Sequence, residues 1–188
     1  MGSQLRIAVI GGESTGKTTL ARALAAASHG VVVSEALRAF VIDHGRTPLQ
    51  EEQHTILLAQ RNRELVAGLD NPQATILCDP ATTMTAIYSE LYFQDTSLRS
   101  QALEFAANYD AMLWCRPDIP WVAEPGQHDG PQFREAADLL ISQWLSDLRA
   151  VTPVLEITGL EGRSSMAQDL LAKLFGSVWQ QPQPRSST

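Results

Sequence analysis

Residues 11–25, GGESTGKTTLARALA, decide the fold of this chain. The first eight of them match the phosphate-loop pattern G-x-x-x-x-G-K-S/T at every position. An apolar, β-branched stretch at 5–10 precedes the loop, and good helix formers follow it to about residue 28. Because a phosphate loop joins a buried strand to a helix, this context argues against a chance match. The stretch predicts a bound nucleoside triphosphate, but it does not say where the terminal phosphate goes.

Each part of this stretch has a predicted chemical role. The glycines let successive backbone N–H groups turn toward the phosphates, and the start of the following helix adds its positive end. Lys17 is expected to reach the β- and γ-phosphates, and the Thr18 hydroxyl is a predicted ligand of Mg²⁺. The ATP-binding residues predicted here are Gly11, Gly12, Glu13, Ser14, Thr15, Gly16, Lys17, Thr18 and Thr19.

The composition of the chain limits the classes of function. Its 188 residues suffice for one sizeable core, and a net charge of −7 with scattered Lys and Arg disfavours nucleic-acid binding. No apolar stretch approaches the ~20 residues that span a bilayer. The apolar N-terminal run leads directly into a glycine loop and lacks a signal-peptide cleavage site. We therefore expect a cytoplasmic protein with a small-molecule partner and no nucleic-acid or membrane partner; oligomeric state stays open.

Strand-like and helix-like stretches alternate along the chain, which predicts a parallel sheet covered on both faces. With the phosphate loop after the first strand, the expected fold class is α/β: a P-loop kinase-like three-layer sandwich with a five-stranded parallel sheet and a lid. We expect one domain over residues 1–176 and a disordered polar tail over 177–188. The strands are expected at 5–10, 31–34, 74–79, 111–115 and 153–157, and helices at 17–28, 35–45, 48–69, 81–92, 97–108, 134–149 and after the loop 158–163.

Residues 116–133 form the predicted lid. The stretch RPDIPWVAEPGQHDGPQF contains four prolines and two glycines, which excludes a continuous helix or strand. Loops of this length in a compact domain are often functional. Asp118, Trp121 and Glu124 are candidate acceptor-binding residues, and Arg134 just beyond is a candidate to stabilise the transferring phosphoryl group. The alternatives are solvated surface charge for the three charged residues and lid packing for Trp121.

Acidic residues follow two of the predicted strands. Asp79 ends the third strand, where its carboxylate either holds Mg²⁺ together with Thr18 or caps the next helix. Glu35 follows the second strand, and Arg38 lies three residues later on the same helix face. Glu35 is a candidate base for an acceptor hydroxyl and Arg38 a candidate anchor for that acceptor, unless the two form a plain ion pair.

The candidate catalytic residues are therefore Lys17, Glu35, Asp79 and Arg134, and either Glu35 or Asp79 is the base. Arg163, in the loop after the fifth strand, is predicted to stack on adenine; the alternative is an ordinary arginine at a helix start.

The chain resembles the ribosylnicotinamide kinase domain of NadR proteins and its stand-alone relatives, which are often described as AAA-type ATP-binding proteins. The resemblance covers about residues 5–175 and is most specific at PDIPWV, with YD seven residues before it. Two places differ from the family pattern: Glu124-Pro125-Gly126-Gln127 replaces a stretch like D-G-x-R, and Asp79-Pro80-Ala81 replaces D-T-D. The matching stretches are GGESTGKTTLARALA, SEALR, LCDPATTMTAIY and YDAMLWCRPDIPWVAEPGQHDGPQFRE.

This resemblance implies ATP- and Mg²⁺-dependent phosphorylation of the 5′-hydroxyl of nicotinamide riboside to nicotinamide mononucleotide, a step of NAD biosynthesis. The positive pyridinium ring of that acceptor suits a lid that carries acids and a Trp face. Two alternatives stay open: a kinase for another nucleoside or a nucleotide, and a non-catalytic ATP-binding regulatory or partner-binding module. A nucleotide acceptor favours several converging arginines, of which this chain offers few.

Overall fold

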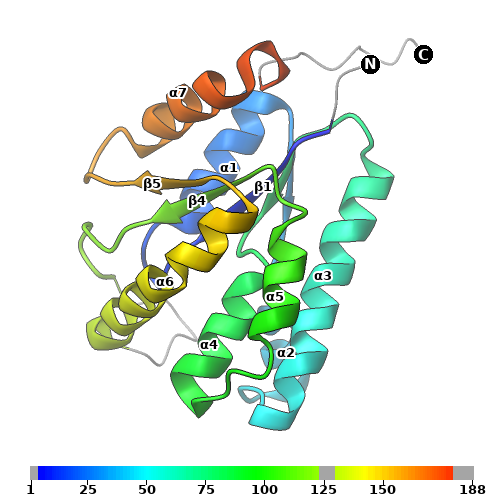
Figure 1. Ribbon diagram of the computed structural model, residues 1–188, viewed down its shortest axis with the longest axis vertical. Helices are drawn as coiled ribbons and strands as arrows, with labels where there is room; N and C mark the ends of the chain where they lie inside the picture. Colours follow the sequence, from blue (N-terminus) through cyan, green and yellow to red (C-terminus); the bar gives the residue numbers. More distant parts are fainter. Residues whose placement is uncertain (1–3, 123–129, 180–188) are drawn as a thin grey trace.

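The computed structural model describes residues 4–122 and 130–179. Its centre is a five-stranded parallel sheet in the order β2-β3-β1-β4-β5 (Figure 1). The central strand β1 is buried from Ile7 to Ile10, and this explains its unbroken apolar sequence. The strands are β1 (Arg6–Ile10), β2 (Val31–Val33), β3 (Ile76–Cys78), β4 (Ala111–Cys115) and β5 (Val154–Ile157).

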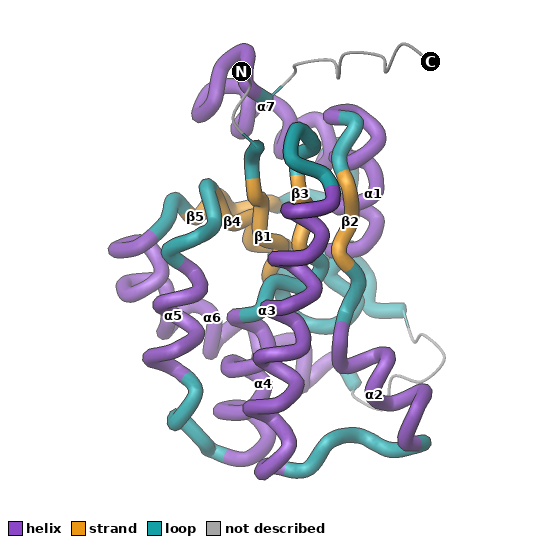
Figure 2. The backbone as a smooth tube through the Cα atoms, turned by 90° about the vertical axis from the view of Figure 1, so that its right-hand side faces the viewer, coloured by secondary structure: helices purple, strands orange, loops and turns teal. Residues whose placement is uncertain are grey.

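Helices cover both faces of this sheet, so the expected three-layer α/β architecture is confirmed (Figures 1 and 2). One face carries α1 (Lys17–Ser28) and α7 (Arg163–Phe175). The other face carries α3 (Gln53–Asp70), α4 (Thr83–Phe93), α5 (Arg99–Ala106) and α6 (Pro131–Val151). Helix α2 (Ala36–His44) packs along α3, and η1 (Gln50–Glu52) and η2 (Gly176–Val178) are short 3₁₀ turns.

Two apolar cores lie on opposite sides of the sheet. Side chains alternate along β1, so that Ala8 and Ile10 belong to one core and Ile7 and Val9 to the other. Trp144, fully buried on α6, is among the largest side chains of the first core. These cores hold the strands in register, and the loops after the strands therefore meet at one edge of the sheet.

Several element boundaries differ from the expectations by a few residues, and two of the differences have a clear physical reason. Helix α6 begins at Pro131 and not at 134, because the fixed φ of proline suits the first position of a helix. The packed chain also continues beyond residue 176. Trp179 is only 2% exposed and packs in the core beside α7, since burying its large apolar ring is favourable. Residues 177–179 therefore belong to the domain and not to the predicted polar tail.

Within residues 4–122 and 130–179, no helix has both the length and the apolar character needed to cross a bilayer.

Candidate active site

Residues 11–16 join β1 to α1 as a phosphate loop does. Gly16 precedes α1 with a φ of 79°, a left-handed conformation that glycine adopts at little cost. The Thr15 hydroxyl and the Lys17 ammonium both donate hydrogen bonds to the carbonyl of Gly12, at 2.8 and 2.6 Å. The Lys17 ammonium therefore lies against the backbone of the loop. Thr18 and Thr19 are exposed at the start of α1.

The first two glycines of the loop lie where other segments approach closely. A Cβ atom on Gly11 would lie 2.6 Å from the carbonyl oxygen of Cys115, at the end of β4. A Cβ atom on Gly12 would lie 2.9 Å from the carbonyl oxygen of Arg134, in the first turn of α6. Glycine is therefore needed here for packing as well as for phosphate binding.

The first described part of the predicted lid, residues 116–122, contacts the phosphate loop. The backbone N–H of Val122 donates to the Ser14 hydroxyl at 3.0 Å, and Ile119 lies 3.5 Å from where a Gly16 Cβ would be. Between them, Trp121 is half-buried. Its indole N–H has no hydrogen-bond partner among the described residues. Glu124, the third predicted acceptor-binding residue of the lid, lies outside those residues.

Arg134 lies beside the phosphate loop, with its backbone and Cγ close to Gly12. It is 8% exposed, and one of its guanidinium nitrogens donates to the carbonyl of Ile119 at 2.8 Å. Its Nε has no partner in the described part of the chain. The residue thus carries a buried positive charge in the first turn of α6, while its action on a phosphoryl group stays a prediction.

Glu35 and Asp79 come together because β2 and β3 are neighbours in the sheet. Val33 pairs with Cys78, and the backbone N–H of Asp79 donates to the Val33 carbonyl at 3.1 Å. Burial raises the pKa of the Glu35 carboxyl above its usual 4.5; the charges of Lys17 and Arg38 oppose this shift and that of Asp79 adds to it. The predicted catalytic groups of the two strands therefore share one electrostatic environment.

Asp79 offers the donor chemistry that Mg²⁺ requires. The residue is 6% exposed, and its Oδ1 has no hydrogen-bond partner among the described residues. An unpartnered buried carboxylate oxygen fits a hard cation, as does the exposed Thr18 hydroxyl. Across the described ranges, no cluster of three or more His, Cys, Asp or Glu side chains forms a metal site.

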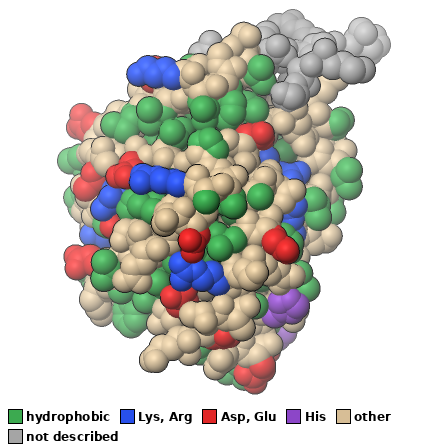
Figure 3. Space-filling model, in the orientation of Figure 1, with side chains coloured by type: hydrophobic (Ala, Val, Ile, Leu, Met, Phe, Trp, Pro, Cys, Tyr) green, Lys and Arg blue, Asp and Glu red, His purple; other side chains and the backbone are tan. Residues whose placement is uncertain are grey.

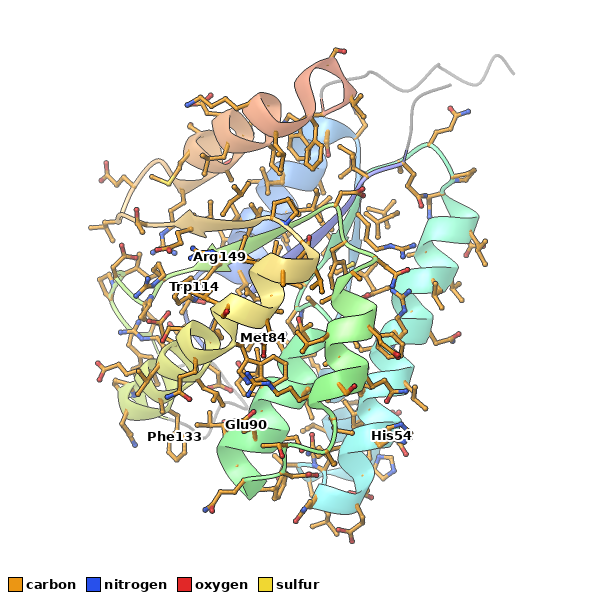
Figure 4. All side chains as sticks on the ribbon, in the orientation of Figure 1. His54, Met84, Glu90, Trp114, Phe133 and Arg149 are labelled. Carbon is orange, nitrogen blue, oxygen red and sulfur yellow. The ribbon has the colours of Figure 1, made fainter. Side chains whose placement is uncertain are left out.

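A small pocket with a free volume of about 20 Å³ lies beside Glu35. Most of its lining residues belong to α3 and α4, among them Met84, which is fully buried on α4 (Figure 4). One carboxylate and no Lys or Arg are found among the lining residues that the structure describes. Those residues are Glu35, Leu37, Gln53, Ile56, Gln60, Pro80, Met84, Thr85 and Tyr88.

Most of this pocket was not predicted from the sequence. Gln53 and Gln60 are buried polar residues on the same helix face as the apolar Ile56. A buried amide on an apolar helix face requires a partner. Glutamines on the apolar face of a predicted helix are therefore the sequence feature that indicates a site on α3. Of the predicted acceptor-binding residues, Glu35 alone lines the pocket among the described residues, and Arg38 lies exposed near it on α2.

Asp118 is predicted to bind the acceptor, and in the structure its carboxylate contacts other parts of the protein. Its carboxylate accepts a hydrogen bond from the backbone N–H of Gly159 at 2.7 Å and pairs with Arg163. The side chain therefore ties the end of β4 to the loop after β5 and does not line the pocket. Its role in acceptor binding stays a prediction.

Arg163 also has contacts within the protein. Its guanidinium donates to the carbonyls of Thr15 and Arg116, each at 2.9 Å, and to that of Gly159 at 2.6 Å. With the Asp118 pair, the side chain holds the phosphate loop, the end of β4 and the start of α7 together. The predicted stacking on adenine stays untested.

The face drawn in Figure 3 shows Lys and Arg side chains interspersed with Asp and Glu, without a concentrated basic patch.

The chain is similar to known proteins over most of its length. A family model described as an AAA domain matches residues 6–163. No match was found among curated protein sequences. A structure of a NadR protein in complex with NR aligns with 98% of this chain at a TM-score of 0.70 and 22% identity. A second, of NadR with NAD and AMP-PNP, aligns with 92% at the same TM-score and identity. The chain spans about half of those NadR chains, 54% and 50%.

Other solved structures share the fold at lower identity. Deoxyadenosine kinase from M. mycoides with bound dCTP matches 90% of this chain and 100% of its own, at a TM-score of 0.62 and 12% identity. Thymidylate kinase from Candida albicans matches 94% of this chain and 94% of its own, at a TM-score of 0.61 and 12% identity. The resemblance to the NadR kinase domain and the predicted fold class are thus confirmed at the level of the fold. This chain belongs to the AAA domain family, and it has the P-loop kinase fold.

Proposed function

We propose that this protein is a kinase that transfers the terminal phosphoryl group of ATP to the 5′-hydroxyl of nicotinamide riboside. The observation that carries the proposal is the pocket beside Glu35, which is lined by one carboxylate and by no Lys or Arg among the described residues. A phosphorylated acceptor favours arginines around its phosphate. The pocket therefore suits an acceptor without a phosphate, and Tyr88 offers an aromatic face to a cationic ring. The NadR structure solved with NR has the same fold.

ATP is the proposed donor, bound by residues 11–19. Backbone N–H groups of the loop and the start of α1 would receive the phosphates. Lys17, whose ammonium now lies on the Gly12 carbonyl, would turn to the β- and γ-phosphates and neutralise their charge. Thr18 and Asp79 would hold Mg²⁺, which supplies further neutralisation of the phosphates when it is bound.

Glu35 is the proposed base. Burial raises the pKa of its carboxyl toward neutral pH, so that the ionised form becomes a stronger proton acceptor. Its side chain lines the pocket and shares its environment with Lys17 of the phosphate loop. An acceptor hydroxyl that lies between the two would lose its proton to Glu35 while its oxygen attacks the γ-phosphorus.

Arg134 and the lid complete the proposed reaction site. Arg134 is buried, and its backbone and Cγ lie beside Gly12; its guanidinium would stabilise the charge of the transferring phosphoryl group. Trp121 and the neighbouring lid residues would exclude water, which otherwise competes with the acceptor hydroxyl. Arg38, Asp118 and Glu124 are further proposed contacts of the acceptor.

An acceptor-dependent assay tests the proposal. Purified protein with ATP and Mg²⁺ is given nicotinamide riboside, a panel of ordinary nucleosides, or nucleoside monophosphates, and ADP formation is measured. We expect ADP formation to rise most with nicotinamide riboside. A stronger response to another nucleoside or to a monophosphate contradicts the proposed acceptor. ATP binding that Lys17→Ala abolishes, without turnover on any acceptor, contradicts the kinase and supports a non-catalytic ATP-binding module.

A further inference from the structure

One buried glutamine of α3 connects the two loops that carry Glu35 and Asp79. The backbone ladder between β2 and β3 ends where the Asp79 N–H donates to the Val33 carbonyl. Beyond this bond the two segments separate: the segment after β2 enters α2, and the segment after β3 leads to α4. The side-chain amide of Gln60 spans the gap between them.

Gln60 uses both ends of its amide for this. Its Oε1 accepts a hydrogen bond from the backbone N–H of Ala36 at 2.7 Å, and its Nε2 donates to the carbonyl of Pro80 at 3.1 Å. Ala36 is the residue after Glu35, and Pro80 is the residue after Asp79. The side chain is 2% exposed, so neither bond is weakened by competition with bulk water.

Glu64, one helical turn further along α3, holds the next part of the Asp79 loop. Its carboxylate accepts hydrogen bonds from the backbone N–H and the hydroxyl of Thr82, both at 2.9 Å. It also accepts one from the Tyr109 hydroxyl at 2.8 Å. Glu64 thereby fixes the start of α4 to α3, and Gln60 can act as a rigid link between the two loops.

We propose that Gln60 is a positioning residue that sets the separation between the Glu35 and Asp79 carboxylates. The inference rests on the proposed function, in which Glu35 takes the proton of the acceptor and Asp79 lies on the metal side. Only a group with a donor and an acceptor at amide spacing satisfies both loops at once. Displacements of about 1 Å at a reacting centre cost roughly 10²-fold in rate. Gln60 can therefore affect the rate of the reaction without contacting the transferred phosphoryl group.

The test compares two substitutions of Gln60 with two control substitutions elsewhere on α3. Gln60→Met keeps an unbranched side chain of similar length and removes both hydrogen bonds, whereas Gln60→Glu keeps the acceptor for Ala36 and loses the donor to Pro80. Gln53→Met changes a second buried glutamine that lines the same pocket but bonds to neither loop. Asn62→Met removes an exposed amide from the same helix and serves as the neutral control.

Steady-state kinetics separate positioning from simple lining of the pocket. For Gln60→Met we expect kcat at saturating acceptor to fall by about 10²-fold, with ATP affinity unchanged in calorimetry. Gln60→Glu should lose less, and Gln53→Met should act mainly on the acceptor KM. A Gln60→Met enzyme that keeps its kcat and changes only acceptor KM or Tm overturns the inference.

A crystal structure of Gln60→Met provides a readout that does not need activity. We expect the Glu35 and Asp79 carboxylates to lie further apart or to rotate relative to each other than in the unsubstituted protein. An unchanged arrangement of the two carboxylates overturns the inference, even if the enzyme is active. If the unsubstituted protein phosphorylates no acceptor, the proposed function fails, and this structure still decides whether Gln60 sets the separation. If Gln60→Met does not fold, Gln60→Glu is used for both measurements.

Discussion

Gly11 and Gly12 lie where the end of β4 and the first turn of α6 approach the phosphate loop. Gly11 has a φ of 145°, and an added Cβ would lie 2.6 Å from the Cys115 carbonyl oxygen. Side chains rarely adopt that backbone conformation, and the overlap involves backbone that cannot rotate away. At the scale of single residues, the loop sequence is therefore constrained by tertiary packing as well as by phosphate.

Gly11→Ala should destabilise the protein by about 2–4 kcal/mol, because it combines an unfavourable φ with overpacking. Gly45→Ala is the matched control, since Gly45 also has a positive φ, of 67°, but nothing lies within 4 Å of its added Cβ. That control should cost only about 1 kcal/mol. Denaturant unfolding measures both. Equal costs for the two variants would show that the contact with Cys115 is relieved by movement of the chain.

Titration of the Glu64 carboxyl should make the free energy of unfolding depend on pH. Burial raises its pKa above the usual 4.5, although hydrogen bonds from Tyr109 and Thr82 and the charge of Arg61 act in the opposite direction. The folded protein therefore keeps this proton to higher pH than the unfolded chain does. The stabilisation is fully present below pH 4.5 and is lost as the pH rises through the raised pKa.

Glu64→Gln should remove this pH dependence. Above pH 4.5, the free energy of unfolding of the unsubstituted protein should fall with rising pH relative to the variant, by at most about 1.4 kcal/mol per pH unit. The raised pKa of Glu35 is present in both proteins and cancels in the difference. Unfolding curves across the acidic to neutral range make the comparison. Parallel pH profiles would mean that Glu64 is ionised in the folded protein at the same pH as in the unfolded chain.

At the scale of elements, the start of α7 is attached to the phosphate loop through Arg163. Its side chain is 11% exposed and bonds to the carbonyls of Thr15, Arg116 and Gly159. Two roles are possible for such a side chain in ATP binding. It either holds the loop that binds the phosphates, or it stacks on the adenine ring as predicted from the sequence.

Arg163→Met distinguishes these two roles. If Arg163 holds the loop, affinities for ATP and for inorganic triphosphate should fall together, by about tenfold, since lost buried hydrogen bonds cost ~1–3 kcal/mol. Lys173→Met, an exposed cation of the same helix, is the matched control and should change neither affinity. Calorimetric titration with both ligands gives the result. A loss confined to ATP would favour stacking on adenine.

The elements themselves were largely predictable, because each strand is a short apolar run and each helix follows a local pattern. Proline chemistry also favours a helix start at Pro131, whereas the proline and glycine content of residues 116–133 as a whole favours a loop up to residue 133. Local patterns do not report which face of α3 meets α4. The pocket that Gln53, Gln60 and Tyr88 line depends on that packing.

Asp118 illustrates the same limit within the predicted lid. Its neighbours in the sequence suggested a role over the acceptor, but its carboxylate bonds to Gly159 and Arg163, more than forty residues further along the chain. Such contacts arise from the order of strands in the sheet, where β4 lies beside β5. By contrast, the proximity of Glu35 and Asp79 required only that two strands end at the same edge of a parallel sheet.

At the scale of the whole molecule, the sheet brings a phosphate loop, a buried carboxyl and a pocket without lysine or arginine among its described residues to one edge. This arrangement supports transfer of phosphate to a bound small molecule in preference to hydrolysis. It also predicts which atom of the acceptor receives the phosphate. In the proposed reaction, the 5′-hydroxyl would lie between Lys17 and Glu35, with the ring of the acceptor on the side of the pocket.

Mass spectrometry and ³¹P NMR of the product test this claim most directly. The protein is incubated with ATP, Mg²⁺ and either nicotinamide riboside or its 5′-deoxy analogue, which lacks the accepting oxygen but keeps the ring and the charge. We expect nicotinamide mononucleotide, phosphorylated at the 5′ position, from the riboside and no phosphorylated product from the analogue. Phosphorylation of the analogue, or equal ADP formation with and without the riboside, would contradict it.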